Sequence, residues 1–265
     1  MSQVNLEFVE DVAVVTTQNP PAELFDEDQV AGLGHALRRA NEHQVRAMVI
    51  KSDSPLFSGG ANVNMFVDKD RRAAREFLSG AMKEVIWAIE DTPFPVIAAV
   101  NGLCFAAGLE VALACDFIYA ADDTVFSQVE ALIGAATFLG GAYRLAERCG
   151  PAVAREIVYT ASSYSAEQFA QWNIVNRVVP IADLHEEALA VAKKIARGPA
   201  LAHSLTKRMV RHALTNDSRS ADEFVLDETT SLFESRDMQN AVAYLLEHGP
   251  RKFRANHDDI VFEGR

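Results

Sequence analysis

The chain has 265 residues, enough for one large domain or for one domain with an extension. Hydrophobic residues make up 49% and charged residues 23%, which is the composition of an ordinary globular protein. The net charge of −12 argues against nucleic acid or an anionic membrane as a general partner. The 3 cysteines form no Cys-x-x-Cys pattern, and the N-terminus has no basic and apolar signal. We therefore expect a soluble cytoplasmic protein.

The first half of the chain alternates between strand and helix patterns. Strands are predicted by alternating or unbroken runs of apolar, mostly β-branched residues, and helices by apolar residues on one helical face. The expected strands cover residues 4–8, 12–17, 45–50, 96–100 and 117–119, and the expected helices cover 26–43, 71–90 and 106–114. This order indicates an α/β layer fold.

A charged residue, Glu110, stands in the middle of the apolar stretch 95–121. A carboxylate in such a place must find a partner or have its pKa raised. A structural ion pair, or a carboxylate that reaches solvent, would explain it without any function. A functional explanation needs a second element close to this carboxylate.

The small residues 106–108 supply such an element, because they open the expected helix. The first N–H groups of a helix lack internal partners and lie at the positive end of its dipole. Ala107 and Glu110 are three residues apart and share a helical face. This stretch could therefore present an oxyanion donor and a carboxylate to one substrate.

The last third of the chain has almost no strand signal. Before it, a final strand is expected at 175–179, and helices are expected at 141–148, at 151–160 and from Ser165. Further helices are expected at 184–196, 199–214 and 220–248. We expect an α/β body over residues 1–195 and a helical region for packing or oligomerisation over 196–265.

Several motifs, in order along the chain, resemble the crotonase superfamily, the enoyl-CoA hydratase/isomerase family. Residues 57–63, Phe-Ser-Gly-Gly-Ala-Asn-Val, are similar to its Phe-Ser-Ala-Gly-Ala-Asp-Leu segment. Residues 95–119 resemble its Pro-Val-Ile-Ala-Ala-Val-Asn-Gly segment, which continues to Glu-Leu-Ala-x-Ala-Cys-Asp. Residues 126–145 resemble Phe-Gly-Gln-Pro-Glu followed by Gly-Gly-x-x-Arg-Leu, and 165–180 resemble the segment that precedes the helical end.

The resemblance implies a spiral of ββα units with a helical trimerisation region, in a trimer or a dimer of trimers. It implies a coenzyme A thioester as substrate, with its carbonyl oxygen between the N–H groups of Ala61 and Ala107. The residues that match the two catalytic glutamates of family hydratases are Glu110 and Glu130. Asn62, Val63, Gly108 and Phe138 lie in the matching substrate-binding segments.

Phe138 lies in a segment, 136–139, that replaces a Pro-Gly segment shaping the acyl pocket in the family. A large side chain there should restrict long acyl chains. We expect the aromatic residues that bound this pocket to be among Phe66, Trp87, Phe138 and Tyr143, although Trp87 could equally serve helix packing.

The first functional hypothesis is a hydro-lyase that adds water to a 2-enoyl-CoA. Two fixed N–H donors would stabilise the enolate, and two neighbouring carboxyl groups could share acid and base roles. The chemistry needs no metal and no cofactor other than the coenzyme A of the substrate. An enoyl-CoA isomerase or another enolate reaction, such as a retro-Claisen cleavage, is the second hypothesis. A catalytically silent family member that only interacts with other proteins is the third.

Overall fold

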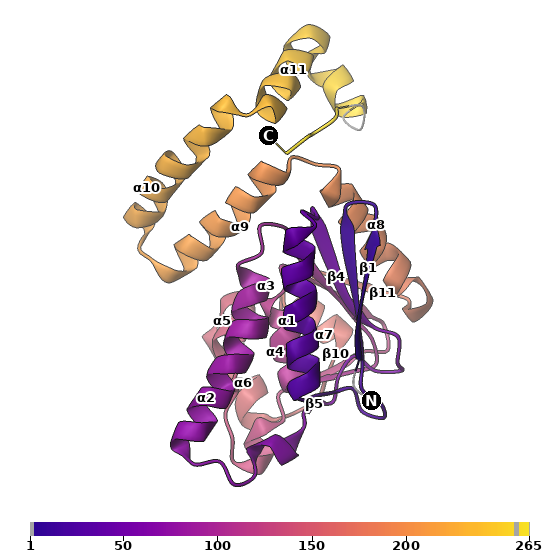
Figure 1. Ribbon diagram of the computed structural model, residues 1–265, viewed down its shortest axis with the longest axis vertical. Coiled ribbons are helices and arrows are strands. Elements are labelled where there is room, and N and C mark those ends of the chain that lie inside the picture. The colour runs from indigo at the N-terminus through magenta and orange to yellow at the C-terminus, as the bar shows by residue number, and fades with distance from the viewer. Residues whose placement is uncertain (1–2, 257–259, 265) are drawn as a thin grey trace.

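The computed structural model describes residues 3–256 and 260–264. Its body is built on a six-stranded sheet with the order β1-β2-β4-β6-β8-β11 (Figure 1). The first two strands are antiparallel, as expected for a hairpin, and the other neighbours are parallel. The strands are β1 (Gln3–Val9), β2 (Val12–Gln18), β4 (Ala47–Ser52), β6 (Val96–Val100), β8 (Phe117–Ala121) and β11 (Arg177–Val179).

Two smaller sheets stand beside this one and carry the loops of the site described below. A three-stranded sheet has the order β10-β9-β7, and a parallel pair joins β3 to β5. Their strands are β3 (Leu24–Phe25), β5 (Gly60–Ala61), β7 (Leu103–Phe105), β9 (Val125–Ser127) and β10 (Tyr164–Ser165). The chain therefore winds from one sheet to another, as the expected spiral of strand and helix units requires.

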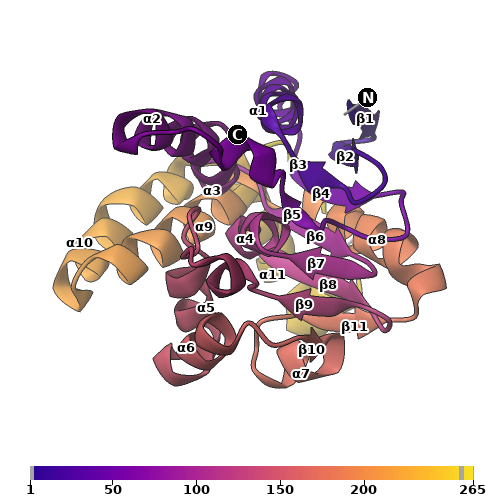
Figure 2. The same cartoon turned by 90° about the horizontal axis from the view of Figure 1, so that it is seen from below.

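Helices cover both faces of the six-stranded sheet. The body contains α1 (Glu27–Glu42), α2 (Arg71–Ala81), α3 (Ala88–Glu90), α4 (Ala107–Ala114), α5 (Gly141–Cys149), α6 (Pro151–Thr160), α7 (Ala166–Gln171) and α8 (Leu184–Ala196). Shorter helical turns are η1 (Val63–Phe66), η3 (Glu130–Ile133) and η4 (Ile181–Asp183), and a π-helical segment, η2 (Met82–Trp87), joins α2 to α3. Figure 2 shows α4 in the middle of the molecule, between the strands and the helices α3 and α5.

The apolar core explains why these strands are central. All of β6 is buried, and so is all of α4, including its one charged residue, Glu110. On one face of the sheet, Leu184, Ala188 and Ala192 of α8 pack against valines and alanines of the strands. The other helices of the body enclose the larger core on the opposite face, so α4 is held inside it.

Most elements expected from the sequence are confirmed. Helix α1 begins after Asp26, whose carboxylate accepts a hydrogen bond from the Gln29 N–H at 2.9 Å. The expected helix 71–90 is one continuous helical segment, with a π-helical turn in its middle. The last strand is shorter than expected, because the N–H groups of Ile174 and Val175 bond to the Phe169 carbonyl at the end of α7.

The prediction of one helix over residues 220–248 is wrong. The chain forms α10 (Ser218–Thr229), the turn η5 (Thr230–Glu234) and α11 (Arg236–Ala255). Ser235 has extended backbone angles and its hydroxyl accepts a hydrogen bond from the Met238 N–H at 3.2 Å. A serine used as an N-cap ends one helical run and starts the next, and the apolar periodicity on both sides conceals this break.

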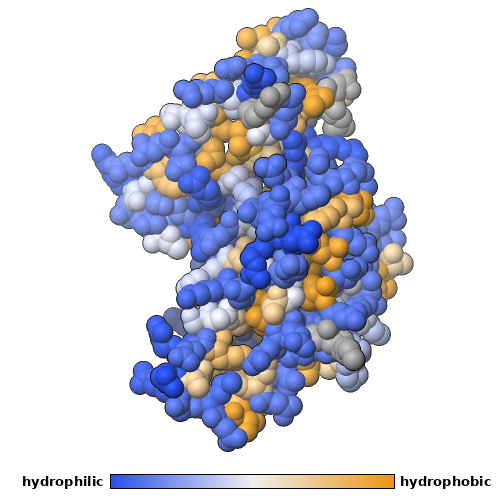
Figure 3. Space-filling view, viewed as in Figure 1, coloured by the Kyte–Doolittle hydropathy of each residue, from blue (hydrophilic) through white to orange (hydrophobic). Residues whose placement is uncertain are grey.

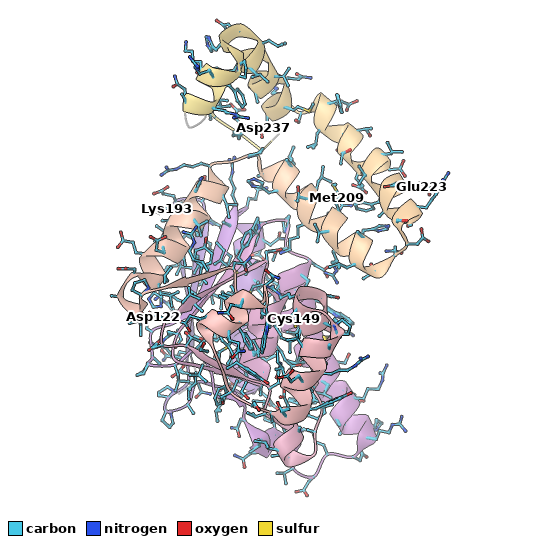
Figure 4. The ribbon with its side chains drawn as sticks, turned by 180° about the vertical axis from the view of Figure 1, so that it is seen from behind. Asp122, Cys149, Lys193, Met209, Glu223 and Asp237 are labelled. Carbon is cyan, nitrogen blue, oxygen red and sulfur yellow. The ribbon has the colours of Figure 1, made fainter. Side chains whose placement is uncertain are left out.

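The last helices form an arm that stands away from the body (Figure 1). Helices α9 (Ala200–Thr215) and α10 lie side by side, as the positions of Met209 and Glu223 show in Figure 4. The buried Asp237 at the start of α11 accepts hydrogen bonds from the N–H groups of Glu263 and Gly264 at 2.7 and 2.8 Å. The arm begins at Ala200, and the expected division of the chain after residue 195 stays a prediction. Among the described helices, none has the length and apolarity needed to cross a bilayer.

Candidate active site

A cavity of about 160 Å³ lies at the N-terminal end of α4. Its walls come from β3, the loop after Gly59, η1, α2, η3 and the segment before α5. The side chains are apolar with two exceptions, Glu110 and Glu130. A small apolar chamber with two carboxyl groups suits acid–base chemistry on an apolar substrate.

Two unusual backbone turns meet at this end of α4. Gly60 has φ +108, and Ala106, just before the helix, has φ +47 with ψ −119. A Cβ on Gly60 would lie 3.0 Å from the Cβ of Ala106, so the two turns touch. Ala106 is held there because its N–H donates to the Ser127 carbonyl at 3.0 Å. A left-handed turn at an alanine costs about 1–3 kcal/mol, which the surrounding structure must supply.

These turns bring Ala61 and Ala107 to one cavity. Ala61 ends the short strand β5, and Ala107 is the first residue of α4. The N–H group of Ala107 lies in the first helical turn, where no intrahelical acceptor exists. The peptide dipoles of α4 also favour negative charge at this position. Both residues line one cavity, and their role as a pair of oxyanion donors stays a prediction.

Gly108 explains how α4 can approach the loop that carries Ala61. A Cβ at this position would lie 2.5 Å from the Cβ of Ser58, closer than two carbon atoms can come. Ser58 is itself fixed, since its hydroxyl donates to the Glu23 carbonyl at 2.8 Å and accepts from the Gly60 N–H at 3.0 Å. Gly108 therefore serves close packing of the helix against this loop.

Glu110 is almost completely buried, with 2% of its surface exposed. Its Oε1 atom accepts hydrogen bonds from the N–H groups of Leu139 and Gly141, both at 2.8 Å. Burial raises the pKa of Glu110 to about 8 and the charge of Glu130 adds to this, while the two N–H groups and Arg144 act in the opposite direction. Glu110 thus keeps its proton near neutral pH when Glu130 is ionised.

Glu130 is the first residue of η3 and faces the same cavity. Burial raises its pKa too, and a hydrogen bond with its own backbone N–H lowers it. The buried Gln128 holds this carboxylate. When its amide is oriented with the nitrogen toward Glu130, it donates to both carboxylate oxygens at 2.9 Å.

Most of the residues predicted for the site do line this cavity. They are Ala61, Val63, Ala107, Glu110, Glu130 and Phe138. Asn62 lies beside it, where its side chain accepts from the Asn64 N–H at 3.1 Å, and Gly108 lies behind the wall. Contact of Asn62 and Gly108 with a substrate stays a prediction, as do the catalytic roles of the two glutamates.

Aromatic rings close one side of the cavity. Phe66 makes edge contacts with Phe138 and Phe77, with ring centroids 5.6 and 6.3 Å apart. Of the four aromatic residues expected at the pocket, Phe66 and Phe138 line this cavity. Trp87 and Tyr143 instead line a second cavity of about 720 Å³ between the body and α9. Both residues face away from α4 because they lie on the outer sides of η2 and α5, where they are 43% and 51% exposed.

Three residues that support the glutamates were not assigned a role from the sequence: Gln128, Gly141 and Arg144. All three lie in the motif over residues 126–145, which indicates that they are near the site but does not show what each side chain contacts. Gly141 must lack a side chain, because a Cβ there would lie 2.4 Å from the end of the Gln128 amide and 3.0 Å from Glu110 Cγ. Its small size lets its N–H reach the Glu110 carboxylate.

The family model for enoyl-CoA hydratase/isomerase matches residues 7–256. The chain belongs to the enoyl-CoA hydratase/isomerase family. This family acts on acyl-CoA thioesters. The matched region contains every residue of the site described above.

Relatives of similar length are about one-third identical to this family member. The crotonyl-CoA hydratase of Syntrophomonas wolfei is 30% identical over 252 residues, covering 94% of this chain and 96% of the relative. The carnitinyl-CoA dehydratase of Salmonella enteritidis is 32% identical over 257 residues, covering 95% and 94%. The chain therefore spans nearly the full length of these enzymes.

Solved structures confirm the crotonase-type fold. An enoyl-CoA hydratase subunit from Geobacillus kaustophilus superposes with a TM-score of 0.90 at 28% identity, covering 99% of this chain and 98% of that one. Pseudomonas aeruginosa DspI gives 0.87 at 29% identity, covering 92% and 94%. The expected spiral with its helical C-terminal region is therefore confirmed.

Proposed function

We propose that this protein is an enoyl-CoA hydratase that adds water across the 2,3 double bond of a 2-enoyl-CoA. The observation that carries the proposal is the meeting of Glu110 and Glu130 in one apolar cavity, next to Ala61 and Ala107. Relatives named crotonyl-CoA hydratase and short-chain-enoyl-CoA hydratase, 30% and 27% identical, support it.

The thioester oxygen would lie between the N–H groups of Ala61 and Ala107. When water oxygen bonds to C3, the π electrons of the double bond move toward the carbonyl, and the oxygen gains negative charge. Donors already fixed in place stabilise that charge without reorganisation, and one such donor typically contributes about 3–4 kcal/mol to the barrier.

The two glutamates would divide the work on one water. Glu110, which keeps its own proton, holds the water by hydrogen bonding and helps to activate it. The Glu130 carboxylate takes a proton from this water as the water oxygen bonds to C3, and passes that proton to C2. The products are a 3-hydroxyacyl-CoA and the enzyme with its protons restored, so the reaction balances with one water consumed. We propose that this chemistry uses no metal and no cofactor beyond the coenzyme A of the substrate, since an oxyanion site and an acid–base pair supply each step.

We also propose a trimer-based assembly in the cytoplasm. The arm exposes large apolar side chains, among them Leu226, Phe233 and Leu246, which are 66%, 68% and 80% exposed. Figure 3 shows apolar patches over the arm, above an indentation that separates it from the body. Burying such side chains against another copy would remove this surface from water. Light scattering that finds only a 29.0 kDa species would contradict the assembly.

The test of the activity follows two reactions in parallel with purified protein. Hydration of crotonyl-CoA is measured by loss of the conjugated enoyl absorbance, and isomerisation of a 3-enoyl-CoA by its appearance. The proposal expects hydration by the wild type, and loss of hydration in both Glu110→Gln and Glu130→Gln. A wild type that isomerises but never hydrates would make the protein an isomerase, and one that does neither would favour a silent family member.

A further inference from the structure

The side chain of Arg144, on the first turns of α5, is buried although it carries a charge. It does not border the cavity of the glutamates, and the reaction proposed above does not use it. Its guanidinium Nε donates to Glu90 Oε1 at 2.7 Å, and its Nη1 donates to the Leu139 carbonyl at 2.8 Å. A buried arginine with several fixed partners normally holds something in place.

Leu139 connects this arginine to the site. Its carbonyl accepts from Arg144, and its N–H donates to Glu110 Oε1 at 2.8 Å. The backbone of Leu139 is therefore bonded to Arg144 through its carbonyl and to Glu110 through its N–H. Gly141, the second donor to Glu110, lies two residues further on and begins the helix that carries Arg144.

The segment 137–141 needs such an anchor. Gly140 has φ +88, and a Cβ there would collide with Arg144 and Tyr143. The Thr137 hydroxyl accepts from the Ala142 N–H at 3.0 Å, which closes the turn but does not set its distance from α4. Arg144 connects this turn to the body, because its guanidinium also donates to Glu90 at the end of α3.

We propose that Arg144 is a positioning residue for Glu110, acting through the backbone of Leu139, with Glu90 as its anchor. The proposal rests on the proposed hydration and assigns this pair the task of aiming the carboxylate at the water. Loss of the arginine would let the segment 137–141 move, and the carboxylate would lose its fixed direction.

The charge of Arg144 supports the same role. It is one of the groups that lower the pKa of Glu110, against burial and the charge of Glu130. The other ionisable groups around the arginine are Glu90, Tyr143 and Glu147, and Arg211 of α9 approaches Glu90 at 3.4 Å. Removing Arg144 should therefore raise the pKa of Glu110 further.

The test compares Arg144→Met with Arg148→Met in the full-length protein. Arg148 is a matched control, because it lies on the same helix and donates to the carbonyls of Ile174, Leu113 and Cys115, none of which bonds to the side chain of either glutamate. Both variants should lose thermal stability. Arg144→Met alone should lower kcat for crotonyl-CoA hydration by about 10- to 100-fold with a small change in KM, because a misplaced catalytic group costs this much. It should also move the alkaline limb of the pH profile to higher pH.

Two further measurements keep the proposal testable. Arg144→Lys retains the charge and a single donor nitrogen, so it should recover part of kcat. It replaces Arg144→Met if that variant does not fold, with Arg148→Lys as its control. Carbon-13 NMR of glutamate carboxyl groups, with the Glu110 signal identified by its loss in Glu110→Gln, reports the Glu110 titration without any turnover.

The outcomes separate this proposal from the proposed function. If kcat and the Glu110 titration are both the same in the wild type and Arg144→Met, the positioning role is overturned and Arg144 is merely structural. Where only Arg144→Lys folds, a kcat equal to that of the wild type overturns it, because the lysine keeps the charge but not the bonds to both Glu90 and Leu139. If the wild type does not hydrate crotonyl-CoA, the proposed function fails, and the NMR titration alone then decides whether Arg144 controls Glu110.

Discussion

Glu110 and Glu130 line one cavity and interact electrostatically, since the charge of Glu130 is among the causes that raise the pKa of Glu110. They arrive from different elements, α4 and η3. Two carboxyl groups that interact in one cavity lose their protons in two steps that belong to the pair. The form with a single proton contains both an acid and a base, and it is the form that hydration requires.

The pH dependence of kcat/KM should therefore be bell-shaped. Activity rises as the pair loses its first proton and falls as it loses the second. The second loss is centred near pH 8, because burial raises the pKa of Glu110 to about 8. Initial rates of crotonyl-CoA hydration across this range test the prediction. An activity that keeps rising well above this pH would contradict it.

The buried Glu110 should also make the protein less stable as pH rises. Its folded pKa is about 8 and its ordinary value is 4.5, so between these values the folded state binds more protons than the unfolded state. The free energy of unfolding must then fall as pH increases through this window. Glu110→Gln cannot ionise, so its advantage over the wild type should grow toward pH 8, to a few kcal/mol. Urea unfolding at pH values on both sides of the window measures this. An advantage that does not change with pH would show that Glu110 is not protonated in the folded protein.

Ala106 stores backbone strain that glycine would relieve. Its φ of +47 with ψ −119 is a conformation that suits glycine. Ala106→Gly should raise the free energy of unfolding by about 1 kcal/mol, after the larger entropy of glycine in the unfolded chain is subtracted. Ala112→Gly, at a buried and regular position of the same helix, is the control and should be destabilising. If both variants lose stability alike, the turn at Ala106 carries no strain.

The aromatic wall should set the length of the acyl chain. Phe138→Ala removes one side of the edge contact with Phe66 and opens the cavity. Because extra methylenes then find apolar space, the ratio of kcat/KM for a long to a short enoyl-CoA should rise about 10-fold or more. Trp87→Ala is the control, because Trp87 lines the second cavity and should leave the ratio unchanged. An unchanged chain-length profile in Phe138→Ala would show that this wall does not limit the substrate.

Much of this fold follows from local patterns. The buried strand at 96–100, the turn at Gly102 and the helix from Ala107 are visible as an apolar run, a flexible dipeptide and an alanine-rich segment. The break at Ser235 could not be found this way, because a single capping hydrogen bond decides it and apolar residues continue on both sides.

The supporting contacts of the site were beyond the sequence for a different reason. Glu110 is marked by its contrast with an apolar neighbourhood, whereas Arg144 looks like any arginine on an exposed helix face. Its burial depends on Glu90, which is 54 residues away in sequence and meets it only in the folded chain, and on the turn that brings the Leu139 carbonyl to it. Trp87 and Phe138 are both aromatic, so their residue types do not reveal that they line different cavities.

The central claim is that Glu110 and Glu130 act together on one water. The most direct measurement is kcat for crotonyl-CoA hydration in Glu110→Gln, Glu130→Gln and the double variant, with butyryl-CoA binding measured alongside. Each single variant should lose about 10²–10⁴-fold in kcat while binding is largely kept, because each removes one acid–base group. The double variant should be little worse than either single variant. Losses that multiply in the double variant, or a single variant that hydrates at the wild-type rate, would contradict the account.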